Sequence, residues 1–273
     1  MPAFLERQLR MARHGDCRMH ERRLDAPDAA GTILYVHGLG ESGLCFERLM
    51  ADERLAGWAH LAVDLEGYGK SGWAQEPLSL VQHAEQLDQL IGRRSLDSVV
   101  VFGHSMGGVI GTRLCERLGT TARAFVNVEG NVSPADCGYS GRAVGYSLDG
   151  WLEHGFDRVL DAIYRHEGES DTVRRAYGAS IQMSDPRAYH ANSRELVAAA
   201  ATETAARRLA ALDATVVFVH GAPRGICERS LELLAEAGIE TLRIDGAGHW
   251  PFLDQHDAFV EAMVGFLNAL PQS

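Results

Sequence analysis

Short runs of apolar, mostly β-branched residues recur along the chain, and stretches with apolar residues at helical spacing separate them. In "LSLVQHAEQLDQLIGRR", for example, Leu80, Ala84, Leu87, Leu90 and Ile91 would share one helix face. Short buried strands that alternate with helices form mostly parallel sheets with helices on both faces. The pattern therefore predicts an α/β fold with a mostly parallel, doubly wound sheet. The strands are predicted in "TILYV", "AHLAVD", "VVVFG", "AFVNV", "ATVVFV" and "IETLRI", and further helices in "CFERLMADERLA", "MGGVIGTRLCERLG", "CERSLELLAEAG" and "DAFVEAMVGFLNAL".

Two segments depart from this alternation. Residues 3–24 alternate loosely around the turn sequence "RHGDC", which predicts a β-hairpin. Residues 132–205 contain several helical patterns and no clear strand. We therefore expect a core of residues 1–131 and 206–273, with a helical cap of residues 132–205 inserted over one edge of the sheet. We expect most aromatic residues of the cap to pack its helices and some to line an apolar pocket: Tyr139, Tyr146, Trp151, Phe156, Tyr164, Tyr177 and Tyr189.

Charge and cysteine content narrow the class of protein. The 273 residues carry a formal net charge of −11, which disfavours nucleic-acid and anionic-membrane partners because an acidic surface repels phosphate groups. The N-terminal residues have no apolar signal-peptide region, and no apolar run approaches the length of a membrane span. An odd number of widely spaced cysteines indicates free thiols and a cytoplasmic location; they are Cys17, Cys45, Cys115, Cys137 and Cys227. The sequence does not decide whether the chain is a monomer or a homodimer.

The segment "VVVFGHSMGG" places Ser105 between Gly103 and Gly107, where a predicted strand runs into a predicted helix. A sharp turn there strains the serine backbone, and the glycines relieve crowding between strand and helix. The turn raises the hydroxyl at the carboxyl edge of the sheet, where α/β proteins bind ligands. Ser105 is therefore a candidate nucleophile, and a helix N-cap is the structural alternative.

A serine nucleophile needs a base, and "DGAGHWPF" supplies a candidate. It places His249 in a glycine loop between the last predicted strand and the last predicted helix, at the same sheet edge as Ser105. Trp250 beside it could face the same cleft. His104 adjoins Ser105 in sequence, so we expect its side chain to point elsewhere. His37 ends the first strongly apolar strand and is predicted to brace the following loop.

These motifs, in this order, resemble those of the α/β-hydrolase family: "HGLGESG", "DLEGYGKSG", "GHSMGG" and "GAGHWPF". The resemblance covers nearly the whole chain and implies that fold. It also implies an oxyanion hole made of the backbone N–H groups of Leu39 and Met106, and a structural role for the loop that starts at Asp64. Esterases, thioesterases, lactonases, amidases and carbon–carbon hydrolases share these signatures, so the resemblance leaves the substrate open.

The acid of the catalytic triad departs from the family pattern. Members of the family usually carry it after the strand that corresponds to "ATVVFV", but residues 214–227 contain neither Asp nor Glu. Arg224, at that site, cannot orient an imidazolium. Some members carry the acid one strand earlier, and here Glu129 directly follows "AFVNV". We therefore expect the triad Ser105–His249–Glu129.

Other carboxylates compete less well for that role. Glu228 is the alternative acid if its helix begins early. Asp213 precedes its strand and would lie at the opposite sheet edge. Asp254 follows His249 closely and is predicted to cap the last helix.

The resulting hypothesis is a serine hydrolase that cleaves a small-molecule ester, thioester or related acyl bond through an acyl-enzyme. A hydrolase or lyase of carbon–carbon bonds, or a binding protein that kept the fold, are the alternatives. We expect no metal, because clustered Cys and His ligands are missing from the sequence, and no other cofactor. The glycines of "GLGESG" match the letters of a dinucleotide loop, but the motifs around them favour an oxyanion loop.

Overall fold

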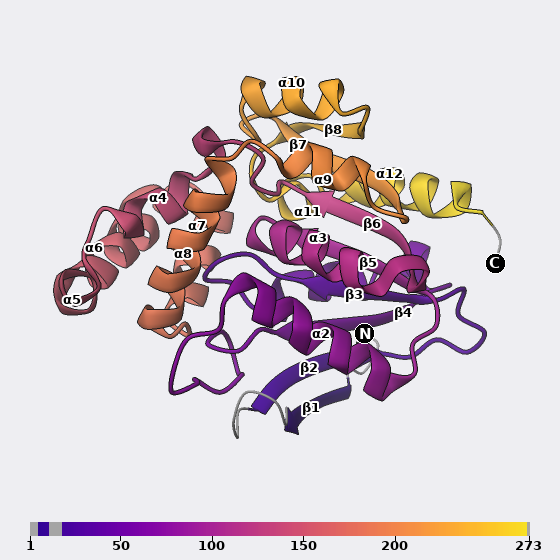
Figure 1. The fold of residues 1–273 in the computed structure, drawn as a ribbon, viewed down its shortest axis with the longest axis horizontal. Coiled ribbons are helices and arrows are strands. Elements are labelled where there is room, and N and C mark those ends of the chain that lie inside the picture. The colour runs from indigo at the N-terminus through magenta and orange to yellow at the C-terminus, as the bar shows by residue number, and fades with distance from the viewer. Residues whose placement is uncertain (1–4, 11–17, 272–273) are drawn as a thin grey trace.

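A single eight-stranded sheet runs through the molecule, with helices on both sides (Figure 1). The structure is a computed structural model, and it describes residues 5–10 and 18–271. The strand order is β1-β2-β4-β3-β5-β6-β7-β8; β2 pairs antiparallel with β1 and β4, and all other pairs are parallel. The mostly parallel α/β sheet is thus confirmed. The strands are β1 (Leu5–Arg10), β2 (Arg18–Leu24), β3 (Thr32–Val36), β4 (Ala59–Asp64), β5 (Val99–His104), β6 (Ala122–Val128), β7 (Thr215–Pro223) and β8 (Glu240–Ala247).

The predicted N-terminal hairpin forms the antiparallel edge of the sheet. β1 and β2 pair in a register that runs from Leu5 opposite Arg23 to Arg10 opposite Arg18. The predicted turn between them lies outside the described residues. β2 continues the sheet by pairing with β4.

Neighbouring residues of β5 show how the two faces of the sheet are covered. Side chains alternate between faces along a strand, so Val101 and Phe102 point in opposite directions. Val101 faces α3 (Met106–Leu118), where the bare Cα of Gly111 leaves room for it and for Phe125. Phe102 faces α12 (His256–Ala269), and its ring centroid lies 5.9 Å from that of Phe259. Both faces of β5 are therefore buried, which explains its continuous apolar run.

The helix predicted at residues 80–94 forms as α2 (Leu80–Arg94). Ser79 and Gln82 make a reciprocal capping box at its start, which satisfies two backbone N–H groups. Its predicted apolar face is buried. α2 packs beside α3 on the same side of the sheet (Figure 1).

The prediction of a single helix between β3 and β4 is wrong. The structure has three short segments instead: η1 (Gly43–Phe46), α1 (Glu47–Met50) and η2 (Glu53–Leu55). Asp52 causes the break, because its backbone is extended and its side chain accepts a hydrogen bond from the Arg54 N–H. Asp52 therefore ends one helical segment and caps the next.

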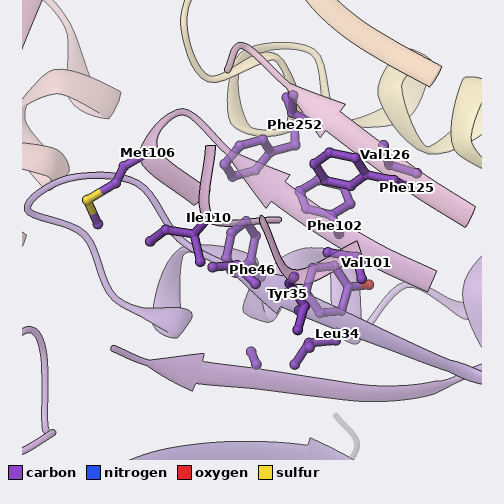
Figure 2. Close-up of a cluster of buried hydrophobic side chains, with 14 of the residues drawn as sticks. Leu34, Tyr35, Phe46, Val101, Phe102, Met106, Ile110, Phe125, Val126 and Phe252 are labelled. Carbon is purple, nitrogen blue, oxygen red and sulfur yellow. The ribbon is translucent and has the colours of Figure 1, made fainter. Parts of the chain in front are cut away.

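An aromatic cluster joins η1 to the loop that carries His249 (Figure 2). Phe46 lies 5.2 Å from Tyr35, 5.4 Å from Phe102 and 5.4 Å from Phe252, measured between ring centroids. Phe252 lies in α11 (Pro251–Asp254), directly after the loop of His249. Because these rings are fully buried, they fix both segments relative to the strands beneath.

The chain between β6 and β7, every residue of which is described, forms helices and no strand. Helices α4 to α8 lie to one side of the sheet (Figure 1). Trp151, fully buried, stacks on Tyr189 at 5.5 Å and donates its indole N–H to the carbonyl of Pro186. Most of the aromatic residues thus pack between these helices, as predicted. The bounds are α4 (Gly138–Val144), α5 (Leu148–Gly150), η5 (Trp151–Gly155), α6 (Phe156–Asp161), η6 (Ala162–Glu167), α7 (Thr172–Ile181), α8 (Pro186–Ala200) and α9 (Ala205–Ala210).

The last part of the chain returns to the strand–helix alternation. α10 (Glu228–Glu236) connects β7 to β8, and α11 and α12 follow β8. Among the described residues, none of the helices combines the length and apolarity needed to cross a membrane. The four cysteines in the described ranges are free thiols, whereas Cys17 lies outside those ranges.

Candidate active site

Ser105 occupies a sharp turn between β5 and α3. Its backbone has φ 52° and ψ −116°, a strained conformation for a residue with a side chain. A Cβ at Gly107 would overlap the carbonyl oxygen of Val36, and one at Gly103 would overlap the backbone of Gly107. Only glycine fits at these two positions, as the sequence predicts for this turn.

Ser105 occupies the N-cap position of α3, but its side chain does not cap the helix. Within the described residues its side chain makes no hydrogen bond to the first turn of α3. The turn is held by main-chain bonds instead: Ser105 N–H donates to Val128 at 2.9 Å, and Gly108 N–H donates to Ser105 at 2.8 Å. The hydroxyl is therefore not engaged in capping.

Glu129 directly follows β6, at the same sheet edge, and contacts His249. Its Oε2 lies 3.3 Å from Nδ1 of His249. Its Oε1 accepts hydrogen bonds from the N–H groups of Gly221 at 2.8 Å and Ile226 at 3.3 Å. The carboxylate is buried while part of the imidazole is exposed. Hydrogen bonds from two neighbouring segments thus fix the carboxylate that faces His249.

The competing carboxylates lie elsewhere. Glu228 is exposed at the start of α10, and Asp213 precedes β7. Asp254 does not cap α12, so that prediction is wrong. Its carboxylate accepts a hydrogen bond from the Gly248 N–H at 2.7 Å, and Gln255 precedes α12. Because α11 intervenes, Asp254 bonds back into the loop of His249 rather than forward into the helix.

Ser105 and His249 line one small cavity of about 20 Å³, together with Leu39 of the loop after β3. Met106 is the first residue of α3. In the described part of the chain, the backbone N–H groups of Leu39 and Met106 have no hydrogen-bond acceptor. Neither N–H group is engaged elsewhere, and their role as an oxyanion hole stays a prediction.

Three aromatic side chains enclose this cavity. The ring centroid of Tyr177 lies 5.0 Å from that of Tyr139 and 5.1 Å from that of Trp250. Burial raises the pKa of Tyr139 to about 12, so its phenol is neutral at ordinary pH. Beyond the rings lie a cavity of about 250 Å³ next to Arg224 and an apolar groove of about 1210 Å³ between α1 and α7. Trp250 borders all three spaces, in line with the prediction that it faces the cleft.

The imidazoles of His37 and His104 both bond to groups other than the Ser105 hydroxyl. His37 Nδ1 donates to the Gly38 carbonyl at 2.8 Å, and its Nε2 accepts from the Leu65 N–H at 2.9 Å. It therefore braces the loop after β3, as predicted, and also the loop after β4. Burial lowers the pKa of His37, which keeps it neutral.

Glu41 is the site residue that sequence reasoning missed. Its buried carboxylate accepts hydrogen bonds from Gly38 N–H at 2.6 Å, from His104 Nδ1 at 2.9 Å and from the indole N–H of Trp250. The only signal in the sequence is an acidic residue directly after "HGLG".

Asp64 has the structural role that was predicted. Its buried carboxylate binds Arg22 and accepts hydrogen bonds from the N–H groups of Gly43 and Lys70, both at 2.8 Å. No group of three or more His, Cys, Asp or Glu side chains in the described ranges is arranged to hold a metal ion.

Curated relatives match the chain over a limited length. A lipase, LipV, from Mycobacterium tuberculosis is 32% identical over 96 residues, which are 35% of this chain and 35% of LipV. A carbendazim hydrolyzing esterase from Nocardioides sp. is 30% identical over 98 residues, 36% of this chain and 40% of the esterase. The matched region thus spans well under half of either relative.

Solved structures match over almost the whole chain. A point mutant of the N-acyl homoserine lactonase AidH, complexed with N-hexanoyl homoserine, superposes with a TM-score of 0.76 at 21% identity, covering 99% of this chain and 98% of AidH. An aryl esterase from Burkholderia cenocepacia, described as putative, superposes with a TM-score of 0.75 at 19% identity, covering 96% and 98%. At such identities these likenesses establish the fold.

The sequence also matches a family model over residues 33–262, from β3 into α12. That range includes the turn at Ser105, the residue after β6 and the loop of His249. The chain therefore belongs to the alpha/beta hydrolase family.

Proposed function

We propose that this chain is a serine hydrolase that cleaves a small-molecule ester, thioester or related acyl bond through an acyl-enzyme. One observation carries the proposal: His249 contacts the buried Glu129 carboxylate and lines the same cavity as the strained Ser105. A nucleophile, a base and a group that orients the base are what acyl transfer requires.

In the proposed mechanism His249 accepts the proton of the Ser105 hydroxyl while Oγ attacks the substrate carbonyl. The tetrahedral oxyanion accepts hydrogen bonds from the N–H groups of Leu39 and Met106. His249 then gives its proton to the leaving group, and a water molecule repeats the sequence to release the acid. Throughout, Glu129 accepts the Nδ1–H bond, which holds the imidazole tautomer with Nε2 free to accept a proton.

The relatives support an ester as the bond cleaved. Among the proteins that match the chain are a lipase, a carbendazim hydrolyzing esterase and an N-acyl homoserine lactonase. Esters and lactones both react at a carbonyl carbon that bears a leaving oxygen. The small cavity at Ser105 favours a short acyl group. The acidic net charge and the free thiols support a cytoplasmic location without nucleic-acid or membrane partners.

A fluorophosphonate probe, followed by a panel of p-nitrophenyl esters and thioesters graded by acyl length, tests the proposal. We expect the probe to label the wild-type chain and Ser140→Ala but not Ser105→Ala, because both serines line the cavity and only Ser105 has the strained turn. An unlabelled wild-type chain would indicate a binding protein. Turnover of a vinylogous diketone without any ester turnover would indicate a carbon–carbon hydrolase instead.

A further inference from the structure

Three loops of the candidate site meet at one buried carboxylate. Oε2 of Glu41 accepts from the Gly38 N–H in the loop before Leu39 and from His104 beside Ser105. Oε1 accepts from the indole N–H of Trp250, beside His249. One side chain therefore bonds to the loop after β3, to the turn at Ser105 and to the loop of His249.

His104 lies between two hydrogen-bond acceptors. Its Nδ1 is 2.9 Å from Oε2 of Glu41, and its Nε2 is 2.8 Å from the backbone carbonyl oxygen of His249. A neutral imidazole carries one N–H and can satisfy only one of these contacts, whereas an imidazolium carries two. A carboxylate and a carbonyl have no hydrogen of their own to donate.

We propose that His104 is an imidazolium paired with the Glu41 carboxylate, and that this buried ion pair is a positioning pair for the three loops of the site. The pair acts through other residues: Glu41 holds the loop that carries Leu39, and His104 holds the backbone of His249. Its positioning role rests on the proposed function, but the charge of His104 does not.

The electrostatic surroundings agree with this charge. Burial opposes ionisation of Glu41, but the charge of His104 and hydrogen bonds from His104, Trp250 and Gly38 outweigh it, so the carboxyl pKa falls to about 2. Burial also opposes a charged His104, and Glu41 outweighs it, so the pKa of His104 is raised above its usual 6.5.

Five other titratable groups face the pair, each from a different segment of the chain. They are Glu129 after β6, His249 in its loop, Cys45 in η1 and Tyr177 in α7, together with His37 at the end of β3. Burial raises the pKa values of Cys45 and Tyr177 and lowers that of His37, so these three are neutral near pH 7. Glu129 adds a second negative charge that favours the imidazolium.

The sign of the pH effect follows from the direction of the shift. A group whose pKa is raised on folding contributes stability that is fully present below its unfolded pKa and is lost as the pH rises through the folded pKa. His104 therefore positions the loops at neutral pH, and activity should fall on the alkaline side as it loses its proton. Removing the charge of Glu41 should move this alkaline limb to lower pH.

Two-bond ¹H–¹⁵N spectra of the full chain labelled at histidine nitrogens test the charge directly. His104→Gln identifies the His104 signals. We expect wild-type His104 to show protons on both ring nitrogens at pH 7.5, and Glu41→Gln to show one. A wild-type His104 with a single ring proton at pH 7.5 overturns the proposed pair, and this measurement needs no active enzyme.

Kinetics of p-nitrophenyl acetate hydrolysis test the positioning role. For Glu41→Gln we expect kcat to fall by about 10- to 100-fold with KM within about twofold, because the reacting groups are misplaced while the cavity persists. We also expect its alkaline limb to begin at lower pH. Unchanged kcat and an unchanged pH profile would overturn the role even if His104 is charged.

Asp52→Asn is the matched control, because Asp52 contacts His256 at 3.0 Å in a similar carboxylate–histidine pair outside the site. We expect it to lower the melting temperature without moving the alkaline limb. A limb that moves equally in both variants would show a structural effect and overturn the proposal. If the fluorophosphonate probe did not label Ser105, the proposed function would be contradicted instead, whatever the charge of His104.

Discussion

Oε2 of Glu129 lies 3.3 Å from Nδ1 of His249, although the two residues are 120 positions apart in the chain. The sheet order explains this proximity. β6 and β7 are parallel neighbours, and the N–H of Glu129 continues their ladder to Val219 at 3.0 Å. The loop after β8 then brings His249 back over the same edge. The position where the family usually carries its acid lies after β7, so the longer Glu side chain reaches across from one strand further away.

Glu129→Gln should reduce turnover of an activated ester by about 10³- to 10⁴-fold, because the amide can no longer hold the required tautomer of His249 as a carboxylate does. The melting temperature should change little, since the amide oxygen can still accept from Gly221 and Ile226. Steady-state kinetics and thermal unfolding check both points. Glu228→Gln is the control and should keep full activity. Loss of activity in Glu228→Gln with an active Glu129→Gln would contradict the assignment.

Gly107→Ala should lower the free energy of unfolding by about 3 kcal/mol or more, since the new methyl group would overlap the Val36 carbonyl and force β3 and α3 apart. Gly265→Ala is the matched control. It lies in α12 with nothing within 4 Å of its Cβ, and should raise that free energy by about 0.5–1 kcal/mol. Urea denaturation measures both. A well-tolerated Gly107→Ala would mean that strand and helix are less tightly apposed than in this structure.

The strands and the three proposed triad positions could be predicted from local sequence. A buried parallel strand is a continuous apolar run, and Ser105 and Glu129 each directly follow such a run. His249 follows β8, an edge strand with mostly exposed side chains, which its glycine-bounded loop sequence helped to place. The carboxyl ends of parallel strands share one edge of the sheet. The position of each residue just after a strand was therefore enough to predict that the three lie close together.

Glu41 could not be predicted, because its role depends on contacts that no local pattern encodes. Its partner Trp250 is 209 positions away, and the approach of the two depends on how η1 and α11 pack through Phe46 and Phe252. The prediction that Asp254 caps the last helix failed for a related reason. Its spacing fits a helix cap, but Asp254 ends α11 and its carboxylate accepts a hydrogen bond from the backbone N–H of Gly248.

Asp64→Asn should destabilise the chain by about 3–5 kcal/mol at pH 7, because it removes the buried negative charge that faces Arg22. The charge of Arg22 and hydrogen bonds from Arg22 and Lys70 outweigh burial and lower the pKa of Asp64 below its usual 3.8. Its stabilisation is thus present above pH 3.8 and lost as the pH falls through the folded pKa. Urea denaturation at pH 7 and pH 3 should show a gap between wild type and variant that narrows in acid. The exposed Asp245→Asn should change stability by less than about 0.5 kcal/mol at either pH, and an equal effect of both variants would refute this role of Asp64.

Tyr177→Ala should widen the range of acyl groups that the site accepts. Tyr177 borders both the cavity of about 20 Å³ at Ser105 and the apolar groove of about 1210 Å³ between α1 and α7. Removing its ring joins the two spaces, so a hexanoyl chain could extend into the groove. We expect kcat/KM for p-nitrophenyl hexanoate, relative to the acetate, to rise by about tenfold. Tyr177→Phe keeps the ring but loses the contact of the Tyr177 hydroxyl with that of Tyr189 at 3.2 Å. It should leave the ratio unchanged, and a ratio that rises equally in both variants would assign the selectivity to the hydroxyl contact rather than to the ring.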